Sequence, residues 1–159
     1  MPASPKKQLI EGLITAFRAS GNQDSAFENL AADRLGINRT DLHCLNAIEN
    51  AGGLTAGELA AEVGLTSGAI TGVIDRLEGA NFARRVPDPT DRRRVNIEVT
   101  PNFYAQANQI WAPLAAEWQK SLATHFTAAE LTRITEFLHL TNQVGKRHLD
   151  RLAKAQSTS

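Results

Sequence analysis

Cysteine is almost absent from this chain: Cys44 is the only one among 159 residues, so an internal disulfide is excluded. Histidine is scarce as well, and apart from His43 the histidines have neither the i,i+4 spacing nor the neighbouring cysteine of a metal site. The chain also lacks a phosphate-binding loop, a nucleophile elbow and a paired-carboxylate motif. We therefore expect no metal, no cofactor and no enzymatic activity.

Long apolar runs are missing too. No segment reaches the roughly 20 apolar residues that a membrane-spanning helix needs. Lys6 and Lys7 precede a mixed amphipathic stretch rather than the apolar core of a signal peptide. Hydrophobic residues make up 42% and charged residues 21%, which is ordinary for a globular protein. The expectation is a single cytoplasmic domain without a membrane partner.

The chain is rich in helix-capping residues around residue 60. Thr55 and Glu58 have the spacing of a capping box, which predicts a helix over Ala56–Val63. Gly64 suits the left-handed conformation of a helix end, and Thr66 can cap a second helix directly afterwards. Two capped helices around a glycine turn are typical of a helix-turn-helix, although any helical hairpin has a similar pattern.

The second of these helices has two unlike faces. Apolar residues at helical spacing predict a core-facing stripe of Ile70, Val73, Ile74 and Leu77. The opposite face has only small or polar residues, namely Ser67, Gly68, Thr71, Gly72 and Asp75. Small side chains allow a helix to enter a DNA major groove, and hydroxyl groups can bond to bases or phosphates. A solvated surface is the alternative, but glycine weakens an exposed helix by about 1 kcal/mol.

A basic hairpin follows the second helix. Phe82–Val86 and Val95–Val99 alternate in polarity as strands do, and the Pro87–Arg93 segment between them is predicted to be a loop. Five arginines and two aspartates lie from Arg84 to Arg94, in a chain whose formal net charge is zero. Such a concentration of positive charge beside a candidate reading helix indicates nucleic-acid binding. Alternatively, the arginines pair with the loop aspartates or with Asp75.

These residues together resemble the winged helix-turn-helix of the MarR family of bacterial transcriptional regulators. The matching segments are residues 59–66, residues 73–78, and above all Asp88–Arg94 leading into Val99 and Thr100, which resembles the wing motif of the family. Chain length and flanking helices also fit, so the resemblance covers nearly the whole chain. One departure is Pro101–Tyr104, which stands where many members have a glycine.

The resemblance implies a mainly α fold with a small β-hairpin wing. Residues 38–100 would form the winged helix-turn-helix lobe, and residues 1–37 and 101–156 long dimerisation helices of the same intertwined domain. The partner would be double-stranded DNA, bound by a homodimer at a pseudo-palindromic operator with half-sites about 10 bp apart. The predicted DNA contacts are Thr66, Ser67, Gly68, Thr71, Arg76, Arg92, Arg93 and Arg94.

The flanks are predicted to be amphipathic helices whose broad apolar faces suit an isologous dimer, with an intramolecular core as the alternative. The pattern indicates an interruption at Gly21–Asn22, a helix capped by Thr40 and a kink at Pro113. Thr127 and Glu130 form a second capping box before the last helix.

The resemblance also implies a repressor that a small aromatic or phenolic ligand releases from DNA. Phe17, His43 and Trp111 are candidates for lining the ligand pocket, although aromatic residues at helical spacing more often belong to the core. A redox-sensing regulator that uses Cys44 is an alternative, but a small buried residue fits its position between Leu42 and Leu45 better. A winged-helix module that binds an acidic protein surface is the other alternative.

Overall fold

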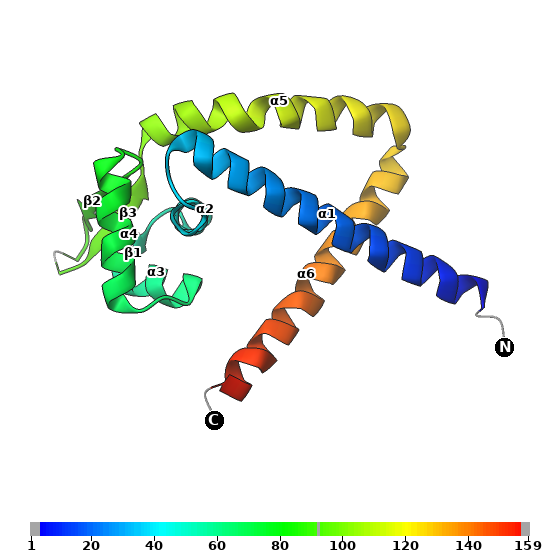
Figure 1. Ribbon diagram of the computed structural model, residues 1–159, viewed down its shortest axis with the longest axis horizontal. Helices are drawn as coiled ribbons and strands as arrows, with labels where there is room; N and C mark the ends of the chain where they lie inside the picture. Colours follow the sequence, from blue (N-terminus) through cyan, green and yellow to red (C-terminus); the bar gives the residue numbers. More distant parts are fainter. Residues whose placement is uncertain (1–3, 92, 157–159) are drawn as a thin grey trace. The chain divides into compact units, whose positions relative to one another are not determined.

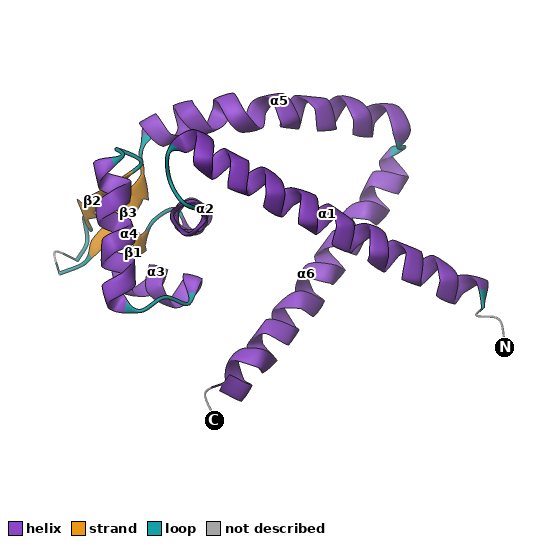
Figure 2. Ribbon diagram, in the orientation of Figure 1, coloured by secondary structure: helices purple, strands orange, loops and turns teal. Residues whose placement is uncertain are grey.

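The structure is a computed structural model that describes residues 4–91 and 93–156. Figures 1 and 2 show long helices and one small sheet. In chain order the elements are α1 (Pro5–Leu35), α2 (Arg39–Ala51), β1 (Leu54–Thr55), α3 (Ala56–Val63), α4 (Ser67–Gly79), β2 (Ala83–Pro87), β3 (Val95–Val99), α5 (Pro101–His125) and α6 (Ala128–Gln156). The mainly α fold with a hairpin wing is confirmed. None of the helices in these two ranges has the length and apolar character to cross a membrane.

The chain divides into two compact units, residues 1–110 and residues 111–159. In the first unit, α2, α3 and α4 enclose a core together with the sheet (Figure 1). Its largest fully buried apolar side chains are Leu42, Leu45, Ile48, Leu59, Ile70, Ile74, Leu77 and Ile97. The core therefore lies within the winged helix-turn-helix lobe, and α4 contributes its whole apolar stripe to it.

The sheet has three antiparallel strands in the order β1-β3-β2. The predicted hairpin is confirmed, with Ala83 opposite Val99 and Arg85 opposite Ile97. Pro87 was expected in the loop, but it ends β2 opposite Val95, where an edge strand tolerates the missing amide. β1 was not foreseen, since a strand of two residues is too short to show an alternating pattern.

Two predicted helix boundaries on the N-terminal side are wrong. α1 runs without a break through Gly21–Asn22. The free-energy cost of one glycine in a helix is small compared with the summed helix propensities of the residues around it. α2 is capped by Asn38 rather than by Thr40: the Asn38 side chain accepts a hydrogen bond from the amide of Asp41 at 2.9 Å. An Asn side chain reaches that amide as well as a threonine does.

α5 begins at Pro101, where proline suits the first turn of a helix. Thr100 links this start to the end of α4: its hydroxyl donates to the Asn81 carbonyl at 2.6 Å and accepts from the Phe103 amide at 3.3 Å. The Asn102 amide group donates to the same carbonyl at 3.2 Å. α5 continues through Pro113 to His125.

The capping box before α6 is confirmed. Glu130 accepts hydrogen bonds from the amide and the hydroxyl of Thr127 at 2.8 and 2.7 Å, and the Glu130 amide donates to the Thr127 hydroxyl at 3.4 Å. These bonds also lower the pKa of Glu130, because they favour its charged form. α6 then extends from Ala128 to Gln156.

Candidate nucleic-acid interface

The turn between α3 and α4 is built as the capping residues predict. Glu58 accepts from the amide and the hydroxyl of Thr55, both at 2.8 Å, and its own amide donates to Thr55 at 3.3 Å. Gly64 ends α3 with a φ of 69°, a conformation that strongly favours glycine. Thr66 then caps α4 by accepting a hydrogen bond from the Ala69 amide at 3.3 Å. The capping chemistry therefore fixes where each helix begins.

The small-residue face of α4 is open to solvent. Ser67, Gly68, Thr71 and Asp75 are exposed and Gly72 is half-buried, whereas the opposite stripe is buried. A methyl group added to Gly68 would meet no atom within 4 Å. The Thr71 hydroxyl donates to the Ser67 carbonyl at 3.0 Å, which leaves its oxygen able to accept a further hydrogen bond. Among the residues that the structure describes, none therefore covers this face at Gly68.

The two aspartates of the wing loop organise its main chain. Asp88 accepts hydrogen bonds from the Thr90 hydroxyl at 2.6 Å and from the amides of Thr90 and Asp91 at 2.8 and 3.0 Å. These bonds hold the pKa of Asp88 far below its usual range. Asp91 accepts from the Arg93 amide at 3.0 Å. The negative charges thus shape the loop by binding its amides.

Three wing arginines form ion pairs with carboxylates outside the loop. Arg84 donates to Glu98 at 2.9 Å across the hairpin, and Arg94 donates to Glu58 of the capping box at 2.8 Å. Arg85 donates to Asp75 on α4 at 2.8 Å and also to Glu78.

At the wing tip, unlike on the strands, the described arginine is not bound to a carboxylate. The Arg93 side chain is exposed and forms no ion pair with the residues that the structure describes. Arg92, another predicted contact, lies outside the described residues. Among the described wing arginines, Arg93 is therefore the one whose guanidinium is not already bound to a carboxylate.

Arg76, predicted as a DNA contact, is bound to a buried carboxylate. Its Nε donates to Oδ2 of Asp41 at 3.1 Å and its Nη2 to Oδ1 at 2.6 Å. Asp41 is 2% exposed, whereas the Arg76 side chain is 52% exposed. The sequence reasoning missed this pair because 35 residues separate its members, and Asp41 near the start of α2 has the pattern of an ordinary first-turn acid.

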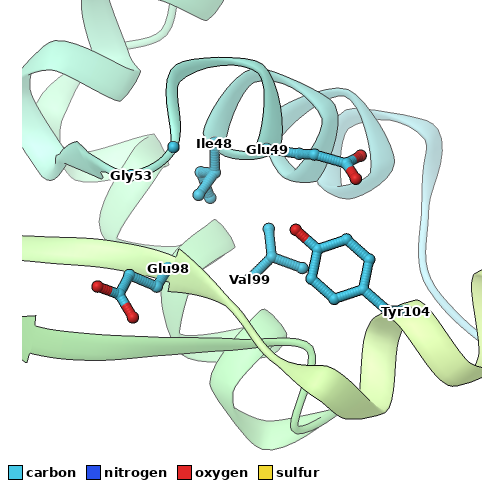
Figure 3. Close-up of a pocket in the computed structure, with 7 residues that line it drawn as sticks. Ile48, Glu49, Gly53, Glu98, Val99 and Tyr104 are labelled. Atoms are coloured by element: carbon cyan, nitrogen blue, oxygen red, sulfur yellow. The ribbon is translucent and has the colours of Figure 1, made fainter.

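The proposed ligand-binding residues remain predictions. Phe17 on α1 and His43 on α2 are exposed, and Trp111 is half-buried in the second unit. A cavity of about 170 Å³ lies between the end of α2, β3 and the start of α5, and Figure 3 shows the Tyr104 ring beside Val99. Its lining is Ile48, Glu49, Gly52, Gly53, Glu98, Val99 and Tyr104, so the three candidates do not belong to it.

Cys44 is fully buried in the core, as its sequence position favours. Burial, with a smaller contribution from the Asp41 carboxylate, raises the pKa of the thiol to about 11. A redox-sensing cysteine needs an accessible and stabilised thiolate. The surroundings of Cys44 have the opposite properties and argue against the redox alternative.

Comparison with known proteins agrees with this architecture. The sequence model of the MarR family matches residues 37–95, the lobe that contains α2, the helix-turn-helix and most of the wing. The chain is 33% identical over 147 residues to the uncharacterised HTH-type transcriptional regulator YcgE of Bacillus subtilis, covering 92% of this chain and 95% of that protein.

Solved structures share the fold. RV1404 from Mycobacterium tuberculosis superposes with a TM-score of 0.62 at 21% identity, covering 91% of this chain and 97% of that one. The F27L mutant of MepR from S. aureus, bound to an oligodeoxyribonucleotide, has a TM-score of 0.55 at 19% identity and covers 84% and 96%. From its helix-turn-helix, its wing and its similarity to YcgE along nearly the whole length of both proteins, the chain belongs to the MarR family of DNA-binding transcriptional regulators.

Proposed function

We propose that the protein is a homodimeric repressor that binds a pseudo-palindromic operator and leaves it when a small aromatic or phenolic molecule binds. The observation that carries this proposal is the open, small-residue face of α4 beside a wing whose Arg93 has no ion pair with the described residues. A major groove about 12 Å wide accepts a helix with such a face. MepR, which shares this fold, is bound to an oligodeoxyribonucleotide in its structure, and this supports DNA as the partner.

The DNA contacts would divide between two elements. The start of α4 would supply Thr66, Ser67, Gly68 and Thr71 to the major groove, with the two glycine positions permitting close approach. The wing tip would supply Arg92 and Arg93 to the neighbouring minor groove, where negative potential attracts arginine. Both elements belong to the first compact unit, so one lobe carries the complete reading surface of a half-site.

Arg76 and Arg94 would support the DNA-binding surface structurally. Both are held by carboxylates, Arg76 by Asp41 and Arg94 by Glu58, and each pair joins two elements of the lobe. We infer that their main contribution is to hold α4 and the loop end of the wing. The exposed part of each guanidinium retains donors that a phosphate can accept.

The dimer would use the terminal helices. Large apolar side chains are exposed along α1, α5 and α6, at Leu9, Ile10, Leu13, Ile14, Phe17, Leu30, Trp118, Leu122, Leu138, Leu140, Val144, Leu149 and Leu152. Leu9 is 74% exposed and Leu149 is 68% exposed. Large exposed apolar surfaces mark protein–protein interaction sites. A second copy of the chain is the natural cover, as residues 1–37 and 101–156 were expected to form dimerisation helices.

The effector would be a small aromatic or phenolic molecule, and Phe17, His43 and Trp111 are the candidate residues for binding it. The exposed side chains of Phe17 and His43 provide a ring surface and a hydrogen-bonding group for such a ligand. A ligand that binds only the folded protein raises its melting temperature. A thermal-shift screen of small aromatic acids therefore tests this part, with non-aromatic acids of equal charge as the control.

The test of the central proposal is selection of genomic DNA fragments by the purified protein. Enrichment of a palindrome whose half-sites are about 10 bp apart is expected. Its binding constant should fall steeply with salt, because each neutralised phosphate contributes about −0.9 to the log–log slope. Absence of any enriched sequence at low salt would refute operator recognition and leave an acidic protein surface as the partner of the wing.

A further inference from the structure

Arg85 connects the wing to α4, the proposed recognition helix. Its side chain leaves β2 and donates to Asp75 at 2.8 Å and to Glu78, both on α4. Glu78 also accepts a hydrogen bond from the Arg85 main-chain amide at 3.0 Å. One arginine is therefore bound by two carboxylates, and one of them holds the strand backbone as well.

The position of this contact makes it mechanically important. β2 is the edge strand of the described sheet, in which it pairs with β3 alone. The start of the hairpin is fixed to α4 by the Phe82 amide, which donates to the Leu77 carbonyl at 2.8 Å, and the Thr100 amide closes the base of the hairpin by donating to the Phe82 carbonyl at 2.9 Å. Arg85 lies further along β2, toward the loop, and provides a second attachment to α4. β3 is attached separately, by its pairing with β1 and by the ion pair of Arg94 with Glu58 on α3, so the Arg85 contacts are what hold the β2 side of the hairpin against α4.

We propose that Arg85 is a positioning residue for operator binding: with Asp75 and Glu78 it fixes the angle between the wing and α4, so that Arg93 and the small-residue face of α4 meet DNA together. This inference rests on the proposed DNA-binding function. Fixing the angle before binding spares the complex the entropy of ordering the wing. The two carboxylates thus favour DNA binding although their charge repels the phosphates.

A direct phosphate contact by Arg85 is the competing role, and the two roles predict opposite effects for the carboxylates. Replacing a negative charge near DNA by a neutral amide should strengthen binding if the charge only repels phosphate. In the positioning role the same replacement, Glu78→Gln, weakens binding because Arg85 loses one of its two carboxylate partners on α4. Arg85→Lys separates the roles further, since lysine keeps the charge but not the two-sided fork of arginine.

Arg84 is the matched control. It is the neighbouring arginine on β2 and its side chain is 59% exposed, but its partner Glu98 is on β3, opposite it in the hairpin. The Arg84 ion pair therefore lies within the wing and does not attach it to α4. Arg84→Lys and Glu98→Gln change charge in the same way as Arg85→Lys and Glu78→Gln, without removing a link to the helix.

The experiment measures binding of a labelled duplex, recovered by the genomic selection, across a series of salt concentrations. Glu78→Gln and Arg85→Lys should each weaken binding about tenfold, and the salt slope should stay unchanged. Arg93→Ala should reduce the slope by about 0.9, and Arg84→Lys with Glu98→Gln should have little effect. Tighter binding by Glu78→Gln, or a reduced slope in Arg85→Ala, would overturn the positioning role.

Amide hydrogen exchange of the protein without DNA separates this inference from the function on which it rests. Glu78→Gln should speed exchange at the amides of Arg85 and Val86 while exchange in α2 stays as in the wild type. Unchanged exchange in β2 overturns the attachment even if the wild type binds its operator. If the wild type selects no DNA, operator recognition fails, and exchange still decides whether Arg85 holds the wing.

Discussion

The Arg76 guanidinium on α4 donates two hydrogen bonds to the Asp41 carboxylate on α2, from Nε at 3.1 Å and from Nη2 at 2.6 Å. Asp41 is buried and Arg76 is half exposed. The pair joins the first turn of α2 to the second half of α4. Since a buried carboxylate needs a partner, this contact ties the recognition helix to the core.

Arg76→Ala should destabilise the fold by about 2 kcal/mol. Removing one member of a buried pair costs about 3–5 kcal/mol, and access of water to the Arg76 side of the pair reduces that figure. Urea unfolding of the variant measures the loss. The control Arg84→Ala removes an exposed pair and should cost less than about 1 kcal/mol. Equal losses in the two variants would contradict a structural role for Arg76.

Replacing both Arg92 and Arg93 by alanine should abolish tight operator binding while thermal unfolding stays nearly unchanged. The described member of this pair, Arg93, forms no ion pair with the described residues, so its loss removes little internal stabilisation. Competition binding against operator and non-specific duplex, together with a thermal melt, measures both quantities. Full retention of binding by the double variant would remove the wing tip from the DNA interface.

Gly68→Leu should leave the fold intact or stabilise it by about 0.5–1 kcal/mol, because leucine favours a helix and meets open space at this position. Operator binding should nevertheless fall at least tenfold, since the added side chain would occupy the space of the DNA groove. Urea unfolding and duplex binding measure these opposite changes. Ala69→Leu, on the same exposed turn, is the matched control for added bulk. A loss of operator binding in Ala69→Leu but not in Gly68→Leu would contradict the proposed docking of α4.

Ile14→Glu should prevent formation of the proposed dimer while the winged helix-turn-helix lobe stays folded. Ile14 is 54% exposed on α1, so a charge there costs little in one chain but much in an apolar interface. Sedimentation equilibrium gives the oligomeric state, and circular dichroism the helix content. Gln8→Glu, an exposed change on the same helix, should leave the dimer intact. A monomeric wild type would rule out the interface altogether.

Cys44 should react with a thiol reagent only after unfolding, because it is buried and its pKa is raised to about 11. The raised pKa also gives stability a pH dependence. The folded state holds the thiol proton more tightly than the unfolded state, so this contribution is complete below pH 9 and is lost between pH 9 and pH 11. Cys44→Ala should lack that decline. Rapid labelling of the native protein at pH 8 would contradict the burial.

The sequence predicted those parts of the fold that are determined by neighbouring residues. Thr55 with Glu58, Gly64 and Thr66 define the two helices of the turn, because each capping contact joins residues three or four apart. The wing hairpin followed from its alternating strands in the same way.

The contacts that position the site could not be predicted as readily, because they join residues far apart in the chain. Arg76 meets Asp41 and Arg94 meets Glu58 only after α2, α3, α4 and the sheet have packed together. Glu98 was within reach of prediction, since the hairpin register places it opposite Arg84. The misplaced break at Gly21–Asn22 shows the converse error, in which a local signal was given more weight than the long helix around it.

The carbonyl of Asn81 receives hydrogen bonds from both Thr100 and Asn102, so one atom at the exit of α4 holds the first residues of α5. Asn81 has a φ of 56°, a left-handed conformation that asparagine adopts more readily than most other residues. A rotation of the first turn of α5 would therefore be transmitted to α4 through these two hydrogen bonds.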